Sequence, residues 1–167
     1  MINIVLYEPE IPQNTGNIMR TCVATNCKLH LIKPLGFDLN ESSVKRSGVN
    51  YIDKLDYVVY ENYEDFCSKN KGMFLYLTRY GNKVYSDFNF NIKEDIYLIF
   101  GKESTGINKE ILKNNLDKCF RIPTSSNVRA LNLSNCVSIV LYEVLRQNKF
   151  FDLELLEPHK INYLEDL

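Results

Sequence analysis

The stretch INIVLYEPEIPQNTGNIMR, residues 2–20, joins a short apolar segment to a polar loop and the start of a helix. Residues 2–6 are mostly apolar and β-forming, which is typical of a buried strand. The polar residues 8–20 include several turn formers, and either Asn14 or Thr15 is suited to cap the helix. The stretch therefore predicts a strand, a turn and a helix, and a capped turn by itself needs no further function.

Short apolar runs recur along the chain and alternate with segments that have helical spacing. Several runs are apolar at consecutive positions, as expected for strands that are covered on both faces. The alternation predicts an α/β fold with a mostly parallel sheet. The runs are residues 2–6, 29–32, 57–60, 73–77 and 96–100.

The composition indicates one domain with an acidic tail. The chain has 167 residues, 45% hydrophobic and 25% charged, which is enough for one buried core. We predict a single domain over residues 1–150 and a tail over residues 151–167, with apolar side chains of residues 150–156 docked on the domain. The tail has five acidic side chains and one lysine, a net charge of −4. Because the whole chain has a net charge of only −1, charge alone does not indicate nucleic-acid binding.

The cysteines and the hydropathy pattern indicate the cellular compartment of the protein. The chain has five cysteines, an odd number, and no two are separated by only two residues, so we predict neither disulfides nor a zinc site. No apolar run approaches the roughly 20 residues that span a membrane, and no charged leader precedes the first strand. We expect a cytoplasmic protein without a membrane partner.

A second segment of interest, GKESTG at residues 101–106, follows the apolar run 96–100. A glycine directly after a buried strand lets a ligand approach the backbone, and open sheets bind ligands at the carboxyl ends of their strands. The segment is not a phosphate loop, because that motif needs a glycine where the chain has Ile96. A glycine-bounded loop without a ligand explains the segment equally well.

A third segment, residues 121–135, leads into an apolar helix that ends near Gln147. Asn132, Ser134 and Asn135 lie in its first turn, where free backbone N–H groups bind ligands or are capped by polar side chains. The apolar positions form a wide stripe, which indicates burial and suggests a second partner such as another subunit. Core packing alone also explains the stripe.

Residues throughout positions 1–150 carry a resemblance to a known family. They are residues 3–12, 14–18 and 20, then His30, Pro34, Gly36, Phe37, Arg46, Gly48 and Tyr51, then Phe100, Gly101, Glu103 and Gly106, and last residues 121–123, 132–135, Val137 and Ser138. Their order and spacing resemble the SPOUT superfamily of knotted RNA methyltransferases. The closest resemblance is to its short TrmL or YibK branch, which methylates the ribose 2'-hydroxyl of the wobble cytidine or uridine, position 34 of tRNA.

The resemblance implies a fold and a cofactor. The fold is a parallel α/β domain with a deep C-terminal trefoil knot, an exception to the rule against knotted chains. In this family three loops hold S-adenosylmethionine in the knot, largely through backbone groups. Ala130 stands where many relatives have serine, so it supplies only backbone contacts. The implied cofactor-binding residues are Leu77, Thr78, Gly101, Glu103, Gly106, Ile122, Ala130, Leu131 and Leu133.

The resemblance also places Arg20 near the target ribose and its phosphate. Methyl transfer to a hydroxyl is an in-line displacement, so the enzyme aligns the oxygen and stabilises developing negative charge, and no metal is required. Arginine stays protonated, so we assign Arg20 to the developing alkoxide and the phosphate, while a base role and a plain surface salt bridge stay open. Asn14 is expected to orient Arg20 or the phosphate, and Asn132 to shape the catalytic site.

The implied partners are a second copy of the chain and the anticodon stem-loop of tRNA. The apolar helix over residues 131–147 and the first helix are the expected dimer contact, with the site completed across it. Arg46 and Arg129, with Lys45 and Arg79, are available for phosphates, and an exposed Tyr142 would stack on an unpaired base. Each basic residue is also compatible with solvated surface, and Tyr142 with the core.

Three functional hypotheses follow. The first is methylation of the wobble ribose, and the second keeps this chemistry at another tRNA site or in rRNA. The third is a non-catalytic RNA-binding or cofactor-sensing dimer, against which the presence of Arg20, Asn14 and Asn132 argues.

Overall fold

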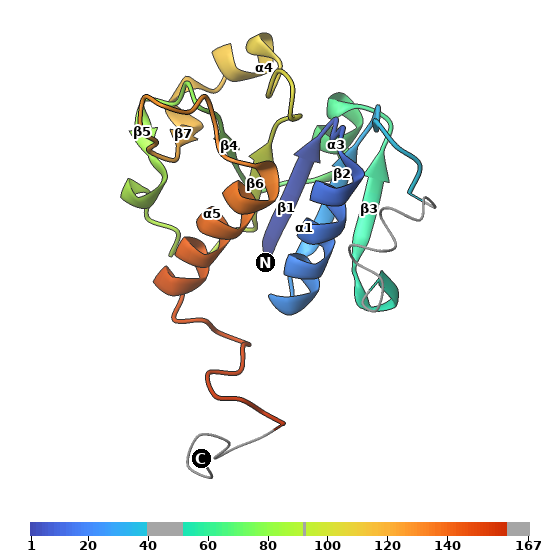
Figure 1. Cartoon of the computed structure of the whole chain (residues 1–167), viewed down its shortest axis with the longest axis vertical. Helices are drawn as coiled ribbons and strands as arrows, with labels where there is room; N and C mark the ends of the chain where they lie inside the picture. Colours follow the sequence, from blue (N-terminus) through green and yellow to red (C-terminus); the bar gives the residue numbers. More distant parts are fainter. Residues whose placement is uncertain (40–51, 92, 160–167) are drawn as a thin grey trace.

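The computed structural model describes residues 1–39, 52–91 and 93–159, and within these ranges the strands form one seven-stranded sheet (Figure 1). The order is β3-β2-β1-β6-β4-β7-β5, and all the paired strands are parallel. The strands are β1 (Ile2–Tyr7), β2 (Lys28–Ile32), β3 (Tyr57–Tyr60), β4 (Met73–Leu77), β5 (Lys83–Val84), β6 (Ile96–Phe100) and β7 (Cys119–Arg121).

The predicted parallel α/β sheet is confirmed. Each of the five apolar runs coincides with a strand, namely β1, β2, β3, β4 and β6. Strands β5 and β7 were not predicted, because they have two and three residues and are too short to show an apolar pattern. They extend the sheet beyond β4 and bring the chain after β7 to the carboxyl ends of the central strands.

Helices cover both faces of the sheet. Helices α1 and α5 lie side by side on one face, and α3 lies on the other (Figure 1). The helical elements are α1 (Pro12–Ala24), α3 (Tyr63–Lys69), α4 (Lys109–Lys113) and α5 (Leu133–Gln147), with 3-10 turns η1 (Ile52–Lys54), η2 (Tyr85–Asp87) and η3 (Leu116–Lys118).

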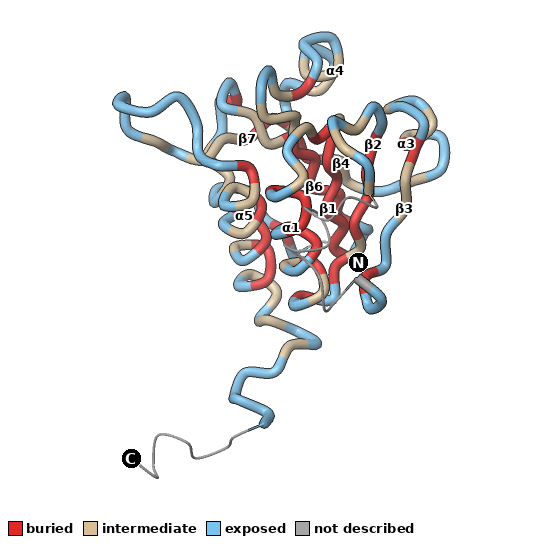
Figure 2. Tube along the Cα trace, turned by 45° about the vertical axis from the view of Figure 1, so that its right-hand side comes forward, coloured by how far each residue is buried: buried red, intermediate tan, exposed pale blue. Residues whose placement is uncertain are grey.

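Strand β1 shows why the central strands are apolar at consecutive positions. Ile4 and Leu6 pack in the core beneath α1 and α5, while Val5 and Tyr7 pack in the core beneath α3. Successive side chains of a strand point to opposite faces, so a strand covered on both faces needs apolar residues at every position. The buried strands at the centre of Figure 2 show this arrangement.

The start of α1 differs from the prediction. Ile11 is the N-cap residue, Pro12 occupies the first turn, and Asn14 and Thr15 are buried inside the helix rather than capping it. Proline suits this position because its fixed φ matches the helix and its missing N–H needs no partner there. The N-cap side chain makes no capping hydrogen bond, so another element supplies the cap.

Helix α5 agrees with its prediction at both ends. It runs from Leu133 to Gln147, and the Asn132 side chain accepts hydrogen bonds from the backbone N–H groups of Ser134 and Asn135. Its buried residues repeat at spacings of three and four, which is the pattern of a helix packed on a core. They are Leu133, Val137, Val140, Leu141, Val144 and Leu145.

A chain of buried polar groups crosses the sheet face beneath α3. His30 is 1% exposed, with Nε2 at 3.1 Å from Asn3 Oδ1 and Nδ1 at 2.8 Å from the Tyr60 hydroxyl. Asn70 Nδ2 lies 3.1 Å from the same hydroxyl. Burial of the imidazole lowers the pKa of His30 to about 4, with a further lowering from Lys28. His30 is therefore neutral in the folded protein at pH 7.

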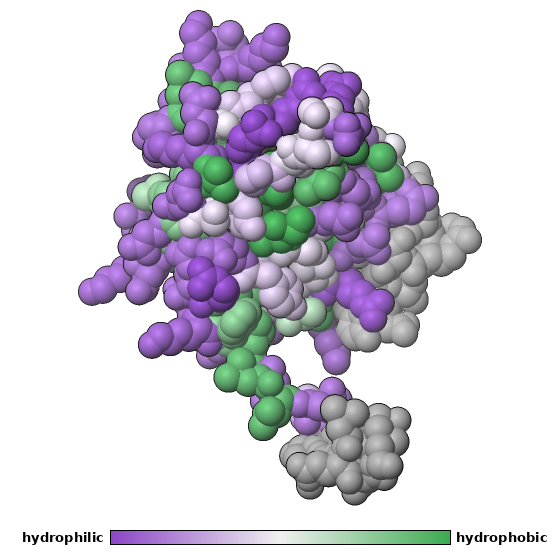
Figure 3. Space-filling view, turned by 60° about the vertical axis from the view of Figure 1, so that its left-hand side comes forward, coloured by the Kyte–Doolittle hydropathy of each residue, from purple (hydrophilic) through white to green (hydrophobic). Residues whose placement is uncertain are grey.

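The segment after α5 docks only in part. Phe150 and Leu153 pack against the core, whereas Leu155 and Leu156 are exposed, Leu156 at 80%. The predicted docking of residues 150–156 is therefore wrong for its second half. Apolar atoms of the described part of this segment appear in green where it leaves the body in Figure 3.

Among the described residues, no helix is both long enough and apolar enough to cross a membrane.

Candidate active site

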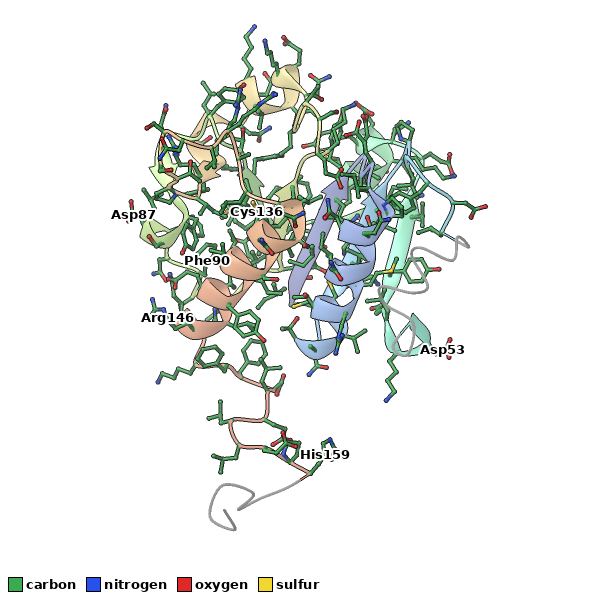
Figure 4. All side chains as sticks on the ribbon, in the orientation of Figure 1. Asp53, Asp87, Phe90, Cys136, Arg146 and His159 are labelled. Carbon is green, nitrogen blue, oxygen red and sulfur yellow. The ribbon has the colours of Figure 1, made fainter. Side chains whose placement is uncertain are left out.

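A cavity of about 840 Å³ opens at the carboxyl ends of β4, β6 and β7. Three segments of the chain line it, namely residues 77–80, 100–107 and 122–133. These are close to the three predicted loops, and the parallel sheet brings them to one edge because each directly follows a strand. Helix α5 adds Cys136, which is labelled in Figure 4.

All nine residues predicted to bind the cofactor line this cavity. They are Leu77, Thr78, Gly101, Glu103, Gly106, Ile122, Ala130, Leu131 and Leu133. The cavity wall combines apolar side chains, exposed backbone at the glycines and a few polar groups, which is the usual composition of a small-molecule site.

Two glycines shape the loop after β6. A Cβ on Gly101 would lie 2.3 Å from the backbone nitrogen of Ile107, so only glycine fits where the loop folds back on itself. Gly106 has a φ of 78°, and a Cβ there would meet no atom within 4 Å. Its N–H donates to the Lys102 carbonyl at 2.9 Å. The loop therefore presents open backbone to the cavity at Gly106.

Glu103 supplies the cap that α1 lacks. Its Oε2 accepts from the Glu10 N–H at 2.8 Å, and its Oε1 accepts from the Ile11 N–H at 3.2 Å. Oε1 also accepts from Asn14 Nδ2 at 3.0 Å. A carboxylate at a helix N-terminus satisfies unpaired N–H groups and interacts favourably with the helix dipole. Glu103 thus fixes the start of α1 against the loop after β6.

Asn14 and Asn132 extend this network to α5. Asn132 Nδ2 donates to Asn14 Oδ1 at 2.9 Å, while Asn132 Oδ1 accepts from the Ser134 N–H at 2.9 Å. The two predicted catalytic asparagines are therefore bonded to each other and line the same cavity. The chain Glu103, Asn14, Asn132 connects the N-termini of α1 and α5.

Two further contacts close the loop after β6 and were missed by sequence reasoning. Lys102 Nζ lies 2.7 Å from Glu8 Oε2, and Glu10 accepts at 2.8 Å from both the N–H and the hydroxyl of Ser104. These hydrogen bonds from Ser104 lower the pKa of Glu10. The partners are 94 positions apart in the chain, so no local pattern indicates them.

The remaining predicted residues lie at different places. Arg20 is exposed on α1 and is not part of the cavity wall, where α1 and its cap residue contribute Asn14 and Ile11. Arg129 lines the cavity, and Tyr142 is 49% exposed on α5 rather than in the core. Arg46 lies outside the described residues.

Sequence reasoning also missed part of the cavity rim. Tyr80, Lys109 and Lys113 line the cavity, and a tyrosine in a loop or lysines on a short helix carry no distinctive signal. Among the described residues, no group of three or more His, Cys, Asp or Glu side chains is placed to hold a metal ion.

Comparisons with known proteins agree on one family. The model of the SpoU rRNA Methylase family matches residues 1–142. A protein of Geobacillus stearothermophilus is 46% identical over 154 residues, 91% of this chain and 98% of that protein. The Geobacillus protein is named, provisionally, as a tRNA (cytidine(34)-2'-O)-methyltransferase.

Solved structures extend the comparison. A Bacillus anthracis protein, provisionally described as an RNA methyltransferase, superposes with a TM-score of 0.88 and 43% identity, covering 94% of this chain and 100% of that one. A second structure, from work on the 2-OH methylation of C/U34 on tRNA, has a TM-score of 0.83 and 35% identity. The matched part is 89% of this chain and 97% of that one.

Proposed function

The chain belongs to the SpoU rRNA methylase family, and from this premise we propose that it methylates the ribose 2'-hydroxyl at position 34 of tRNA, cytidine or uridine, with S-adenosylmethionine as the donor. The observation that carries the proposal is the cavity at the carboxyl ends of the strands, which unites all nine predicted cofactor-binding residues with Asn14 and Asn132. The name of the Geobacillus relative and the topic of the C/U34 structure support the choice of nucleotide.

The cavity suits S-adenosylmethionine in size and chemistry. Small-molecule sites commonly measure about 300 to 1,000 Å³, and this one measures about 840 Å³. Leu77, Ile122 and Leu133 offer apolar surface for a flat adenine ring, while Gly106 and Ala130 offer backbone groups. When bound, S-adenosylmethionine supplies an electrophilic methyl group on a positively charged sulfur.

The residues of the chain align and stabilise the acceptor. We assign Arg20 to the ribose and its phosphate, because a guanidinium stays protonated and binds developing negative charge. Asn14 and Asn132 are positioning residues, since their carboxamides link the helix that carries Arg20 to the cavity wall. Glu103 keeps that helix at its place by capping it.

The position of Arg20 supports a site shared between two copies. Arg20 lies six residues after Asn14 on α1, about 9 Å along the helix, and outside the cavity wall of its own chain. On α5, Ile139 and Tyr142 are exposed and three positions apart, so they form an exposed apolar stripe on one side of the helix. We propose that a second copy covers this stripe and that each Arg20 serves the cavity of the partner.

The trefoil knot belongs to the same proposal. The chain inserts β6 between β1 and β4 and then adds β7 on the other side of β4 before α5 returns to pack on α1. This path supports threading of the C-terminal part through the cavity loops. Because the proposed substrate is tRNA, we place the protein in the cytoplasm. Its proposed RNA partner is the anticodon stem-loop. The reaction as proposed uses no metal.

Methylation of a defined transcript tests the proposal. The purified protein is incubated with S-adenosylmethionine and an unmodified tRNA, and the nucleosides are identified by mass spectrometry. We expect one 2'-O-methyl group at position 34, and none in a matched transcript that carries 2'-deoxyribose only there. Methylation that persists in the deoxy transcript overturns the position.

The second candidate is methylation of ribosomal RNA, which the description of the family favours. Methyl transfer to rRNA fragments but not to tRNA would establish it in place of the wobble reaction. Binding of RNA without methylation of any RNA would instead support the non-catalytic dimer.

A further inference from the structure

Residues 78–81 form a tight turn between β4 and β5 at the mouth of the cavity. The Gly81 N–H donates to the Thr78 carbonyl at 3.1 Å, and the Thr78 N–H donates to the Phe120 carbonyl at 2.9 Å. A Cβ on Gly81 would lie 2.6 Å from the Phe120 carbonyl carbon, so the turn is pressed against β7. Arg79 and Tyr80, the two central residues of the turn, are therefore held at its exposed tip.

Arg79 and Tyr80 form a stacked pair. The guanidinium carbon of Arg79 lies 4.5 Å from the centroid of the Tyr80 ring, and a guanidinium nitrogen donates to the Tyr80 hydroxyl. The attraction of a cation to an exposed aromatic face is weak, and it favours this orientation of the ring. Tyr80 is nevertheless 65% exposed, so most of its surface is open at the edge of the cavity that it lines.

Unpaired positive charge surrounds this ring. Arg129 and Lys109 line the same cavity, and in the described ranges neither has an ion-pair partner. The hydrogen bond from Arg79 lowers the pKa of Tyr80 most, and the charges of Arg79, Arg129 and Lys109 lower it further, as expected for cations that face the ring. Glu103, an acidic residue of the same wall, is committed to the cap of α1.

We propose that Tyr80 is a stacking platform for a base that flanks the methylated nucleotide, and that Arg129 and Lys109 bind the adjoining phosphates. An exposed aromatic ring among unpaired cations is the chemistry by which proteins hold single-stranded RNA. Because the ring lies at the mouth of the methyl-donor cavity, stacking there would hold the target ribose at the entrance. The inference rests on the proposed function and adds an RNA-positioning residue to it.

Substitution of Tyr80 in the full-length protein tests the platform. The variants are Tyr80→Leu and Tyr80→Phe, and Tyr57→Leu is the matched control, because Tyr57 is 40% exposed on β3 at the opposite edge of the sheet. We expect Tyr80→Leu to raise the KM for an anticodon stem-loop RNA about five- to tenfold, with little change in kcat, because it loses one base–aromatic stack. Tyr80→Phe retains the ring and should recover most of this loss, and Tyr57→Leu should match the unmodified protein.

Three further measurements separate the explanations. Calorimetric titration with S-adenosylmethionine should give the same Kd for Tyr80→Leu as for the unmodified protein, and a weaker Kd with an unchanged RNA KM would make Tyr80 a cofactor residue instead. Arg129→Ala and Lys109→Ala should each reduce the salt dependence of RNA binding by about one phosphate contact. If the protein methylates no RNA, the proposed function fails, and RNA binding by fluorescence anisotropy still tests the platform. Equal RNA affinity of Tyr80→Leu and the unmodified protein overturns it.

Discussion

At the scale of single residues, Glu103 shows how one side chain joins distant parts of the site. Both of its carboxylate oxygens accept hydrogen bonds, from two backbone N–H groups at the start of α1 and from Asn14. A carboxylate can accept at both oxygens at once, whereas a carboxamide must present an NH₂ group on one side. The charge and the symmetry of the group are therefore both needed here.

We expect Glu103→Gln to lower the free energy of unfolding by about 1 to 3 kcal/mol, because the new NH₂ group faces hydrogen-bond donors. Urea unfolding followed by circular dichroism measures the change. Glu110→Gln is the control, since Glu110 is an exposed residue of α4 whose contact with Lys113 is 4.0 Å long, and it should cost less than about 0.5 kcal/mol. Equal stabilities of the two variants would contradict the assigned cap.

The hydrogen bonds of His30 fix its tautomer. Asn3 Nδ2 donates to the Ile96 carbonyl, so Asn3 Oδ1 is the acceptor and His30 Nε2 must carry the proton. Nδ1 then accepts from the Tyr60 hydroxyl, which in turn accepts from Asn70. A second proton on the ring would require the Tyr60 hydroxyl to turn from Nδ1 to Asn70 Oδ1, which lies 3.4 Å away, so protonation replaces a short hydrogen bond with a longer one.

This arrangement predicts a loss of stability in mild acid. The folded pKa of His30, about 4, lies below the ordinary value of 6.5, so the unfolded chain binds the proton more readily. The stabilisation is complete above about pH 6.5 and is lost as the pH falls towards 4. Between pH 7 and pH 5 the free energy of unfolding should decrease by about 2 kcal/mol from this residue. A His30→Gln variant, measured by urea unfolding at both pH values, should lack this part of the decrease.

At the scale of helices and strands, the N-terminus of α5 has two separable roles. Asn132 caps the helix through Oδ1 and holds Asn14 through Nδ2. Asn132→Ala should lower the free energy of unfolding by about 1 kcal/mol, whereas Asn132→Ser keeps a capping oxygen and should lose much less. Both variants lose the donor to Asn14, so both should slow methylation, by about tenfold or more. A serine variant as active as the unmodified protein would remove the positioning role from Asn132.

The elements also show what the sequence can predict. Five strands could be predicted because each is a continuous apolar run, and α5 because its apolar residues recur at spacings of three and four, whereas the residues of the cavity wall were predicted from the family resemblance. The two-residue strand β5 has no such period and exists because β7 pairs with it. The cap of α1 escaped prediction because Asn14 and Thr15 are good caps in isolation, while Pro12 and the distant Glu103 decide where the helix begins. Tyr80 was not predicted as a residue of the cavity rim, because the position of its turn beside the cavity is not indicated by its neighbours in sequence.

At the scale of the whole molecule, the separation of Arg20 from its own cavity predicts complementation between subunits. Arg20→Ala should lower kcat by at least about 100-fold, because in the proposed mechanism Arg20 supplies the charge that stabilises the developing alkoxide. Gly106→Val should block the space beside the loop and also be inactive. When the two variants are co-expressed, roughly a quarter of the unmodified rate should return, since about half of the dimers are mixed and each has one complete site.

The mixed dimer works only if Arg20 of the valine variant reaches the intact cavity of the alanine variant. An Arg20 that served its own chain would leave the mixture inactive, because neither chain would then have both parts. Sedimentation equilibrium of the unmodified protein at micromolar concentration is the companion measurement. A monomeric mass there would contradict the shared site.

The cap of α1 has a consequence for how the protein is made. The N–H groups of Glu10 and Ile11 donate to the carboxylate of Glu103, which lies 93 and 92 positions later in the chain. At a synthesis rate of about 5 to 20 residues per second, Glu103 emerges roughly 5 to 20 seconds after them. The partner strand β6 also arrives late, so β1 first pairs with β2 alone. During translation the first helix therefore emerges before its cap, and the cavity wall is complete only after residues 122–133 and α5 have emerged.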